Sequence, residues 1–254
     1  MEKMSMVDRM KHYEMDSERV GATDPHSPVV IRLDGCSFHT WVKKAGLKKP
    51  FDRRMIDAMQ TTALALCNGV QTSVMAYVQS DEISLVLRND QSENSDSWFG
   101  NRIQKLCSIS ASMCSVAFNN RMAELTDGDA PLAYFDSRVI FLPSKEEVFN
   151  CLMWRQRDCI RNSISGLAQA NFSHRELDKK NSDEKKAMLL ERGIDWESLK
   201  TDEKYGAFVH REARKGDYNG TEFIRKVFFV DCEFGKVDMD KFMGAYDFNV
   251  EDVK

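Results

Sequence analysis

The sequence predicts an α+β protein, in which an antiparallel sheet of the split βαβ type carries helices on one face and a helical second half contains a β-hairpin. In the first half, short apolar runs of strand length alternate with longer amphipathic segments of helix length. In the second half, helix-start signals predominate, and two apolar runs are joined by Asp217-Tyr218-Asn219-Gly220, a strong hairpin-turn signal.

The first half opens with a charged lead-in helix and a loop over residues 1–28, which contains Pro25 and Pro28. The next elements are expected in this order: a strand at 29–33, a helix at 52–67, two strands at 74–78 and 83–87, a helix at 98–118 and a strand at 132–142. Asn68-Gly69 ends the first of these helices, and a loop is expected over 119–131. This order fits a split βαβ sheet of the polymerase-palm type.

Two serine-led capping boxes, Ser144–Glu147 and Ser173–Glu176, predict helix starts in the second half. We expect helices to about Ser165 and over 181–190, strands at 205–210 and 223–234, and a peripheral acidic tail at 238–254. The whole chain, residues 1–254, is expected to form one domain, with a palm-like core at 1–143 and a helical and hairpin part at 144–254.

Net charge, cysteine content and the length of the apolar runs exclude several classes of protein. The chain has 254 residues and a net charge of −4, which argues against indiscriminate nucleic-acid binding but not against a local basic face. The chain has seven cysteines, which is an odd number, and no C-x-x-C motif. This pattern indicates neither a disulfide framework nor a zinc site. No apolar run approaches the roughly 20 residues of a membrane helix, which predicts a cytoplasmic protein without a membrane partner.

Acidic residues stand where strands end. Asp34 follows the run 29–33, and Asp81-Glu82 lie at the tip of the hairpin 74–88. If these strands are neighbours, Asp34 and Asp81 meet at one edge of the sheet, where carboxylates repel one another unless a divalent cation lies between them. Hard oxygen ligands suit Mg²⁺, and polymerases use two such ions. The alternative is that both aspartates are ordinary turn residues.

Cations and small polar residues follow the first strand. Backbone N–H groups of the turn Asp34–His39 could face a triphosphate. The next segment is either a phosphate-binding patch or a solvated helix face, and its cations are Lys43, Lys44, Lys48, Lys49, Arg53 and Arg54. Arg102 and Lys105, one turn apart near a helix start, either share a face that meets anions or simply face solvent.

Taken together, these motifs resemble the tRNA(His) guanylyltransferase family, and most closely its Thg1-like members, which add nucleotides in the 3′–5′ direction. The matching segments occur in the family's order between about residues 29 and 160, and the resemblance is thin beyond residue 165. They are Arg32-Leu33-Asp34-Gly35, Phe38-His39, Lys49-Pro50 with Asp52, Gln79–Glu82 with Ser84, Trp98-Phe99, Phe135-Asp136 with Arg138-Val139, Pro143-Ser144, and Trp154-Arg155-Gln156 with Asp158-Cys159.

The resemblance implies roles for individual residues. Asp34, Asp81 and Glu82 would be catalytic, and Asp34, Asp81 and the carbonyl of Gly35 would bind two Mg²⁺ ions. The nucleotide would contact Asp34, Gly35, Cys36, Ser37, Phe38, His39, Lys49, Ser80, Asp81, Arg102 and Lys105. The tRNA would contact Lys43, Lys44, Arg138, Arg155, Asp158, Arg161 and Asn162.

One departure affects the expected substrate. Where eukaryotic members carry His-Ile-Asn-Asn-Leu-Tyr, tied to recognition of the tRNA(His) anticodon, this chain has Ile160-Arg161-Asn162-Ser163-Ile164-Ser165. That favours the branch that repairs 5′-truncated tRNAs by templated addition, using ATP or GTP for activation and other nucleoside triphosphates for extension. Strict addition of G to tRNA(His) and a non-catalytic RNA-binding module are the alternatives. Relatives assemble as tetramers, so the resemblance also implies a homo-oligomer.

Overall fold

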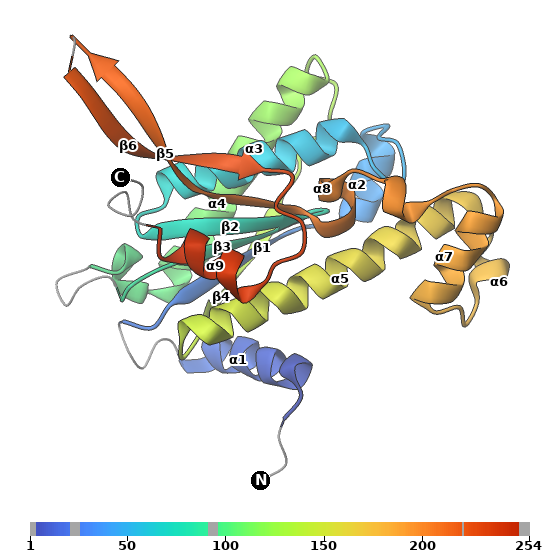
Figure 1. Ribbon diagram of the computed structural model, residues 1–254, viewed down its shortest axis with the longest axis horizontal. Helices are drawn as coiled ribbons and strands as arrows, with labels where there is room; N and C mark the ends of the chain where they lie inside the picture. Colours follow the sequence, from blue (N-terminus) through green and yellow to red (C-terminus); the bar gives the residue numbers. More distant parts are fainter. Residues whose placement is uncertain (1–3, 21–25, 91–95, 220, 249–254) are drawn as a thin grey trace.

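A computed structural model describes residues 4–20, 26–90, 96–219 and 221–248 (Figure 1). Within these residues, six antiparallel strands form one sheet in the order β4-β1-β3-β2-β5-β6. The strands are β1 (Val29–Gly35), β2 (Ser73–Gln79), β3 (Glu82–Leu87), β4 (Phe135–Phe141), β5 (Ala207–Tyr218) and β6 (Thr221–Asp231). The predicted α+β class and the split βαβ order of the first four strands are confirmed.

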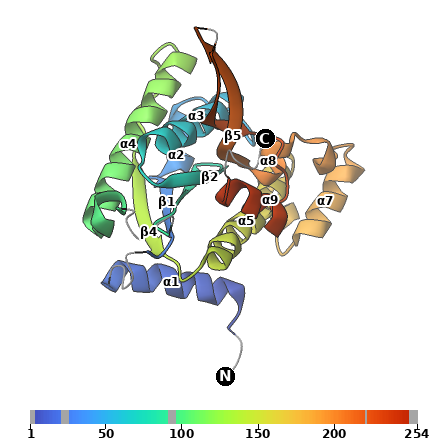
Figure 2. The same ribbon diagram turned by 60° about the vertical axis from the view of Figure 1, so that its left-hand side comes forward.

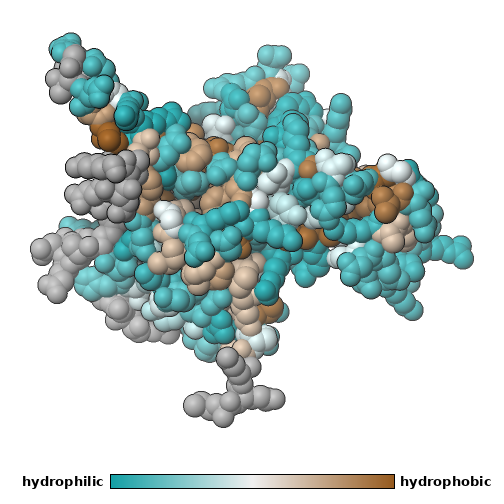
Figure 3. Space-filling model, in the orientation of Figure 1, coloured by the Kyte–Doolittle hydropathy of each residue, from teal (hydrophilic) through white to brown (hydrophobic). Residues whose placement is uncertain are grey.

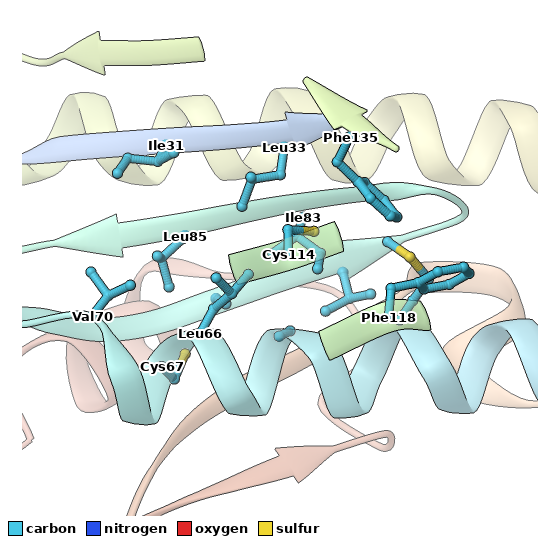
Figure 4. Packing of buried hydrophobic residues seen from close by; sticks show 14 of the residues in the cluster. Ile31, Leu33, Leu66, Cys67, Val70, Ile83, Leu85, Cys114, Phe118 and Phe135 are labelled. Atoms are coloured by element: carbon cyan, nitrogen blue, oxygen red, sulfur yellow. The ribbon is translucent and has the colours of Figure 1, made fainter. Parts of the chain in front are cut away.

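One face of the sheet is covered by α3 (Arg53–Gly69), α4 (Ile103–Leu125) and the short helix α2 (Phe38–Lys44). Alternate residues of β1 and β3, among them Ile31, Leu33 and Leu85, point into this layer (Figure 4). They pack against Leu66 of α3 and Phe118 of α4, and all of these side chains are buried. This core fixes the direction in which β1 and the β2–β3 hairpin end.

The second face is covered as well, by α1 (Met6–Val20), α5 (Lys145–Asn171) and α9 (Met239–Tyr246). The expectation of helices on one face therefore holds only for the palm-like helices α2 to α4. The other set of alternate strand residues is also apolar, with Val30 and Val86 fully buried, so this face needs cover too. Tyr246 of α9 is buried, which corrects the expectation of a peripheral tail up to that residue; residues 249–254 lie outside the described chain.

The hairpin β5–β6 joins the sheet of the first half, because Ala207–Val209 pair with β2. Its far end extends beyond the sheet as a two-stranded arm (Figures 1 and 2). The turn was predicted at Asp217–Gly220, and Gly220 lies outside the described residues. Figure 3 shows a mainly hydrophilic face with hydrophobic patches near this arm and on the lobe of short helices that follows α5.

The helical lobe packs on the end of α5 and comprises α6 (His174–Leu177), α7 (Ser182–Glu191), the 3₁₀ turn η2 (Trp196–Ser198) and α8 (Thr201–Tyr205). Its small core includes Ile164, Leu167 and Trp196. Because Leu167 and Ala168 bury in this core beyond Ser165, α5 continues to Asn171 and is longer than predicted. α4 likewise continues to Leu125, since Met122 joins Phe118 in the buried core at a position where a loop was expected.

Another short helical element is the 3₁₀ turn η1 (Trp98–Asn101), which precedes α4. Among the described residues, no helix is both long and apolar enough to cross a membrane.

Candidate active site

Asp34 and Asp81 lie at the same edge of the sheet. Asp34 stands opposite Glu82 across the β1–β3 pair, and the N–H of Gly35 donates to the carbonyl of Asp81 over 3.1 Å. Ser80 forms the hairpin tip with a left-handed φ of 46°, which starts β3 immediately after Asp81. The predicted convergence of the two strand ends is thus observed.

The carboxyl groups at this edge repel one another. Burial, and after it the charges of the neighbouring acids Asp81, Glu82 and Asp136, raise the pKa of Asp34 to about 6. Burial also raises the pKa of Asp81, although a hydrogen bond from Ser80 opposes the shift. Groups whose charged forms are disfavoured in this way are stabilised by a cation that binds between them.

Asp136 is an acid that sequence reasoning did not place in the site. It lies directly opposite Asp34 across the β1–β4 pair, on the outer strand of the sheet, with a half-exposed side chain. The signal was available in the Phe135-Asp136 motif, because in a sheet of this order the start of β4 lies beside the end of β1.

The turn after β1 is shaped by an aromatic cluster. Phe38 stacks on Trp41 with ring centroids 4.9 Å apart and contacts Phe118 and Phe135. The ring lies so close to Gly35 that an added Cβ would be 2.2 Å from a ring carbon. Ser37 adopts a left-handed conformation and starts α2. Glycine at position 35 therefore allows the chain to turn tightly between the acid and the helix.

We expect Gly35→Ala to destabilise the protein by about 1–3 kcal/mol, because Phe38 must leave its packed position. Urea unfolding measures this change. Gly244→Ala is the control: a Cβ there meets nothing within 4 Å, and alanine favours a helix by up to about 1 kcal/mol. Equal unfolding free energies for wild type and Gly35→Ala would contradict the packing described here.

A cleft of about 520 Å³ opens beside Asp81. Ser80, His39, Lys48 and Lys49 are among its lining residues, as are Phe38, Val42, Pro50, Asp52, Met55, Gly166, Gln169 and Ala170. The last three come from the part of α5 beyond Ser165, which the predicted helix did not include. Gln169 adds an exposed amide to this wall. The cleft is large enough for a nucleotide.

The basic segment divides into two groups. Lys48 and Lys49 line the cleft, and the N–H of Lys48 donates to Asp52 over 2.8 Å, which ties this loop to the start of α3. Arg54 binds the same aspartate and lowers its pKa to about 2, and Arg53 donates to Asp202 of α8. Of the six cations in this segment, only Lys48 and Lys49 line the cleft and are placed to meet an anion there.

Glu82 has counter-ions within the chain. Arg155 of α5 binds it through two nitrogens at 2.7 and 2.6 Å, and Arg155 also donates to Asp158 over 3.1 Å. Arg32 lies 4.0 Å from Glu82 and pairs with Glu14 of α1. Both of these predicted tRNA contacts are mostly buried: Arg155 ties α5 to Glu82 of the sheet, and Asp158 binds Arg155 within the same helix.

The remaining predicted residues are spread over the surface. Arg102 and Lys105 lie at the start of α4, where Asn101 bonds Asn89 beyond the end of β3; this is the opposite end of the sheet from Asp34. Within one chain they do not reach the cleft. The others are exposed on the outside of the molecule: Cys36, Lys43, Lys44, Arg138, Arg161 and Asn162.

The oxygen donors fit Mg²⁺ shared with a nucleotide. In the described parts of the chain, no group of three or more His, Cys, Asp or Glu side chains is arranged to hold a metal ion by itself. Mg²⁺ typically binds one or two carboxylates and completes its shell with water and substrate phosphates. Asp34 and Asp81, beside a cleft lined by lysines, provide that partial set.

Fold and site together define a palm-type α+β protein with an acidic sheet edge beside a nucleotide-sized cleft. The family model of Thg1, the tRNA(His) guanylyltransferase, matches residues 7–143. The chain belongs to this family.

Relatives and solved structures agree with that placement. A bacterial Thg1-like protein in complex with ATP is 36% identical with a TM-score of 0.79, and the match covers 96% of this chain and 98% of that one. A second such structure, in complex with GTP, is 34% identical with a TM-score of 0.75 and covers 97% and 100%. A probable tRNA(His) guanylyltransferase of Mus musculus is 34% identical over 55% of this chain and 46% of its own length, so the matched segment spans about half of that relative.

Proposed function

We propose that this protein adds nucleotides to the 5′ end of tRNA in the 3′–5′ direction, directed by a template, and so repairs shortened ends. The observation that carries the proposal is the meeting of Asp34 and Asp81 at one sheet edge, beside the lysine-lined cleft. The two bacterial structures, described as complexes with ATP and with GTP, match nearly the whole chain and support nucleotide binding as part of the proposal.

The reaction consists of two phosphoryl transfers. An oxygen of the RNA 5′-monophosphate attacks the α-phosphorus of ATP or GTP, and pyrophosphate leaves, which gives a nucleotidylated 5′ end. The 3′-hydroxyl of an incoming nucleoside triphosphate then attacks the activated 5′-phosphate of the RNA, loses its proton, and displaces the nucleoside monophosphate. An RNA with a 5′-triphosphate could enter directly at the second step, with pyrophosphate as the leaving group.

Each residue of the site has a proposed role. Asp34, Asp81 and the carbonyl of Gly35 would hold two Mg²⁺ ions, which when bound lower the pKa of the attacking hydroxyl and neutralise phosphate charge. Lys49 and its neighbour Lys48 would bind the triphosphate and offset charge on the leaving pyrophosphate. The turn from Cys36 to His39, with Ser80, would position the nucleotide.

Glu82 acts indirectly in this proposal. Since Arg155 occupies both of its carboxylate oxygens, it would position the hairpin tip that carries Asp81. The exposed residues Lys43, Lys44, Arg138, Arg161 and Asn162 would contact the tRNA, and Arg155 and Asp158 would not.

The proposal is tested with 5′-monophosphorylated tRNAs that lack their first nucleotide, incubated with Mg²⁺, ATP and each nucleoside triphosphate in turn. We expect the nucleotide complementary to the template position to be added, whether it is G, C, A or U. Addition of G alone, and only to tRNA(His), would instead support the narrower activity for which the curated relatives are named. Binding without any addition would indicate a non-catalytic RNA-binding module.

Two further expectations accompany this function. Assembly into a homotetramer is a proposal that sedimentation velocity tests. A cytoplasmic location is a proposal that fractionation of cells tests.

A further inference from the structure

A second polar cavity, of about 290 Å³, lies at the opposite end of β2 from the candidate active site. Val74 near the start of β2 lines it, whereas Asp81 follows the last residue of that strand. A strand of this length spans roughly 20 Å, so a single nucleotide cannot occupy both places. Its charged lining residues are Arg88, Arg211, Lys226 and Asp247.

The carboxylates near this cavity bind Arg88 and Lys145. Arg88 pairs with Asp90 over 2.9 Å and with Asp247 over 2.6 Å. Asp247 is also shared with Lys145, at 3.5 Å. Asp247, the carboxylate among the described lining residues, is therefore already bound by two cations.

Arg211 has no carboxylate within ion-pair distance among the described residues, and it is the residue that points to a ligand. Its side chain donates to the carbonyl of Ser73 over 2.8 Å and lies over the ring of Phe228, 4.6 Å from the centroid. Burial lowers the pKa of this guanidinium, so the surrounding protein disfavours its charge. A part-buried cation without a counter-ion is costly and is stabilised by any anion that enters beside it.

Lys226 extends the same positive surface. Arg211 pairs with Phe228 across the β5–β6 ladder, and Lys226 is two residues from Phe228 on β6. Because side chains alternate along a strand, Arg211 and Lys226 are diagonal neighbours on one face of the arm. Both line the cavity. A guanidinium fork next to an ammonium is an arrangement that binds phosphate oxygens.

We infer that Arg211, together with Lys226, forms a phosphate-binding site separate from the nucleotide cleft. The cavity lies at the lower end of the volume range of small-molecule pockets, roughly 300–1,000 Å³, which favours a phosphate group over a whole nucleotide. The phosphate comes either from an RNA backbone or from a free phosphate compound. The inference does not depend on the proposed activity, because it concerns charges outside that site.

The first test measures the rise in melting temperature that inorganic phosphate produces in the full-length protein, with ionic strength held constant by NaCl. Arg211→Gln keeps an amide near the carbonyl of Ser73 and removes the charge. Arg121→Gln is the matched control, because Arg121 is already bound by Asp57 at 2.6 Å and by Glu124 at 2.8 Å. Phosphate bound in the nucleotide cleft contributes equally to all three proteins, so the difference reports on Arg211.

We expect Arg211→Gln to lose at least half of the phosphate-dependent shift, while wild type and Arg121→Gln show the full shift. Lys226→Gln, an exposed change that leaves Arg211 in place, is expected to lose a smaller part. A full shift in Arg211→Gln would overturn the inference, whatever the starting melting temperatures are. No enzymatic readout enters this test, so the result stands even if nucleotide addition is never observed.

A second measurement identifies the source of the phosphate. The dissociation constant for a tRNA transcript is measured over a series of NaCl concentrations. If the site binds an RNA backbone phosphate, Arg211→Gln lowers the slope of log Kd against log[NaCl] by about one, relative to Arg121→Gln. An unchanged slope, together with the lost phosphate shift, assigns the site to a free phosphate compound.

Discussion

Asp34→Asn is expected to abolish nucleotide addition while it stabilises the fold above pH 6. The carboxylate is needed for Mg²⁺ in the proposed mechanism, and several kcal/mol of lost transition-state stabilisation correspond to at least about a thousandfold in rate. Single-turnover assays with saturating tRNA measure the loss. Asp81→Ala is expected to have the same effect on the rate without disrupting the fold.

The stability effect has a defined pH dependence. The pKa of Asp34 is raised to about 6 in the folded protein from 3.8, so the folded state binds this proton more tightly than the unfolded state. The associated stability is fully present below pH 3.8 and is lost as the pH rises through 6. Removing the charge with asparagine therefore raises the melting temperature at pH 8, and the advantage disappears at pH 4.

Asp129→Asn is the control for Asp34→Asn and Asp81→Ala. It changes an exposed residue in the loop before β4 and is expected to alter neither the rate of nucleotide addition nor the pH dependence of stability. Undiminished turnover in Asp34→Asn or Asp81→Ala, in protein that melts normally, would refute the assignment of the acidic edge as the catalytic centre. A melting temperature for Asp34→Asn that is below wild type at pH 8 would contradict the electrostatics of the site.

Arg155→Ala is expected to destabilise the protein by about 3–5 kcal/mol, because it leaves Glu82 buried without its main counter-ion. Both side chains are mostly buried, with 12% and 9% of their surface exposed. Thermal or urea unfolding measures the loss. Adding Glu82→Gln to this variant is expected to restore part of the stability, since the unpaired charge is removed with its partner.

Arg161→Ala provides the comparison on the same helix. The Arg161 side chain is 68% exposed and pairs with Asp158, so its loss should cost less than about 1 kcal/mol. If Arg155 contacts tRNA instead, Arg155→Ala will unfold like the wild type and bind tRNA more weakly. That pattern would restore the role implied by the family resemblance and contradict the positioning role assigned here.

Local patterns predicted much of the fold. The apolar runs of β1, β2 and β3 and the amphipathic stripe of α3 were recognisable because burial imposes a period of two or of 3.6 residues. α4 and α5 were predicted too short, at Phe118 and at Ser165. Their last turns are stabilised by contacts with the sheet and with the helical lobe, which are distant in sequence and leave no local signal.

The site was predicted only in part, because local patterns reveal some of its residues and packing brings in the others. Asp34 and Asp81 were found because each directly follows a strand or its turn. The cleft wall at Gly166 and Gln169, and the position of Asp136 opposite Asp34, depend on how α5 and β4 pack. Arg102 and Lys105 were predicted near the nucleotide, but the direction of α4 carries them to the far end of the sheet.

The sequence by itself determined the secondary elements, the α+β class, the family and the pair of acids, because these follow from residue types at short spacings. Only the tertiary structure decided which charges face a ligand and which neutralise one another. Glu82 and Arg155 are 73 positions apart, yet their ion pair removes both from the surface. Among the residues that the structure describes, Arg211 has no such partner. That difference arises from packing, which brings together charges that are distant in the chain and fixes how far each is removed from water.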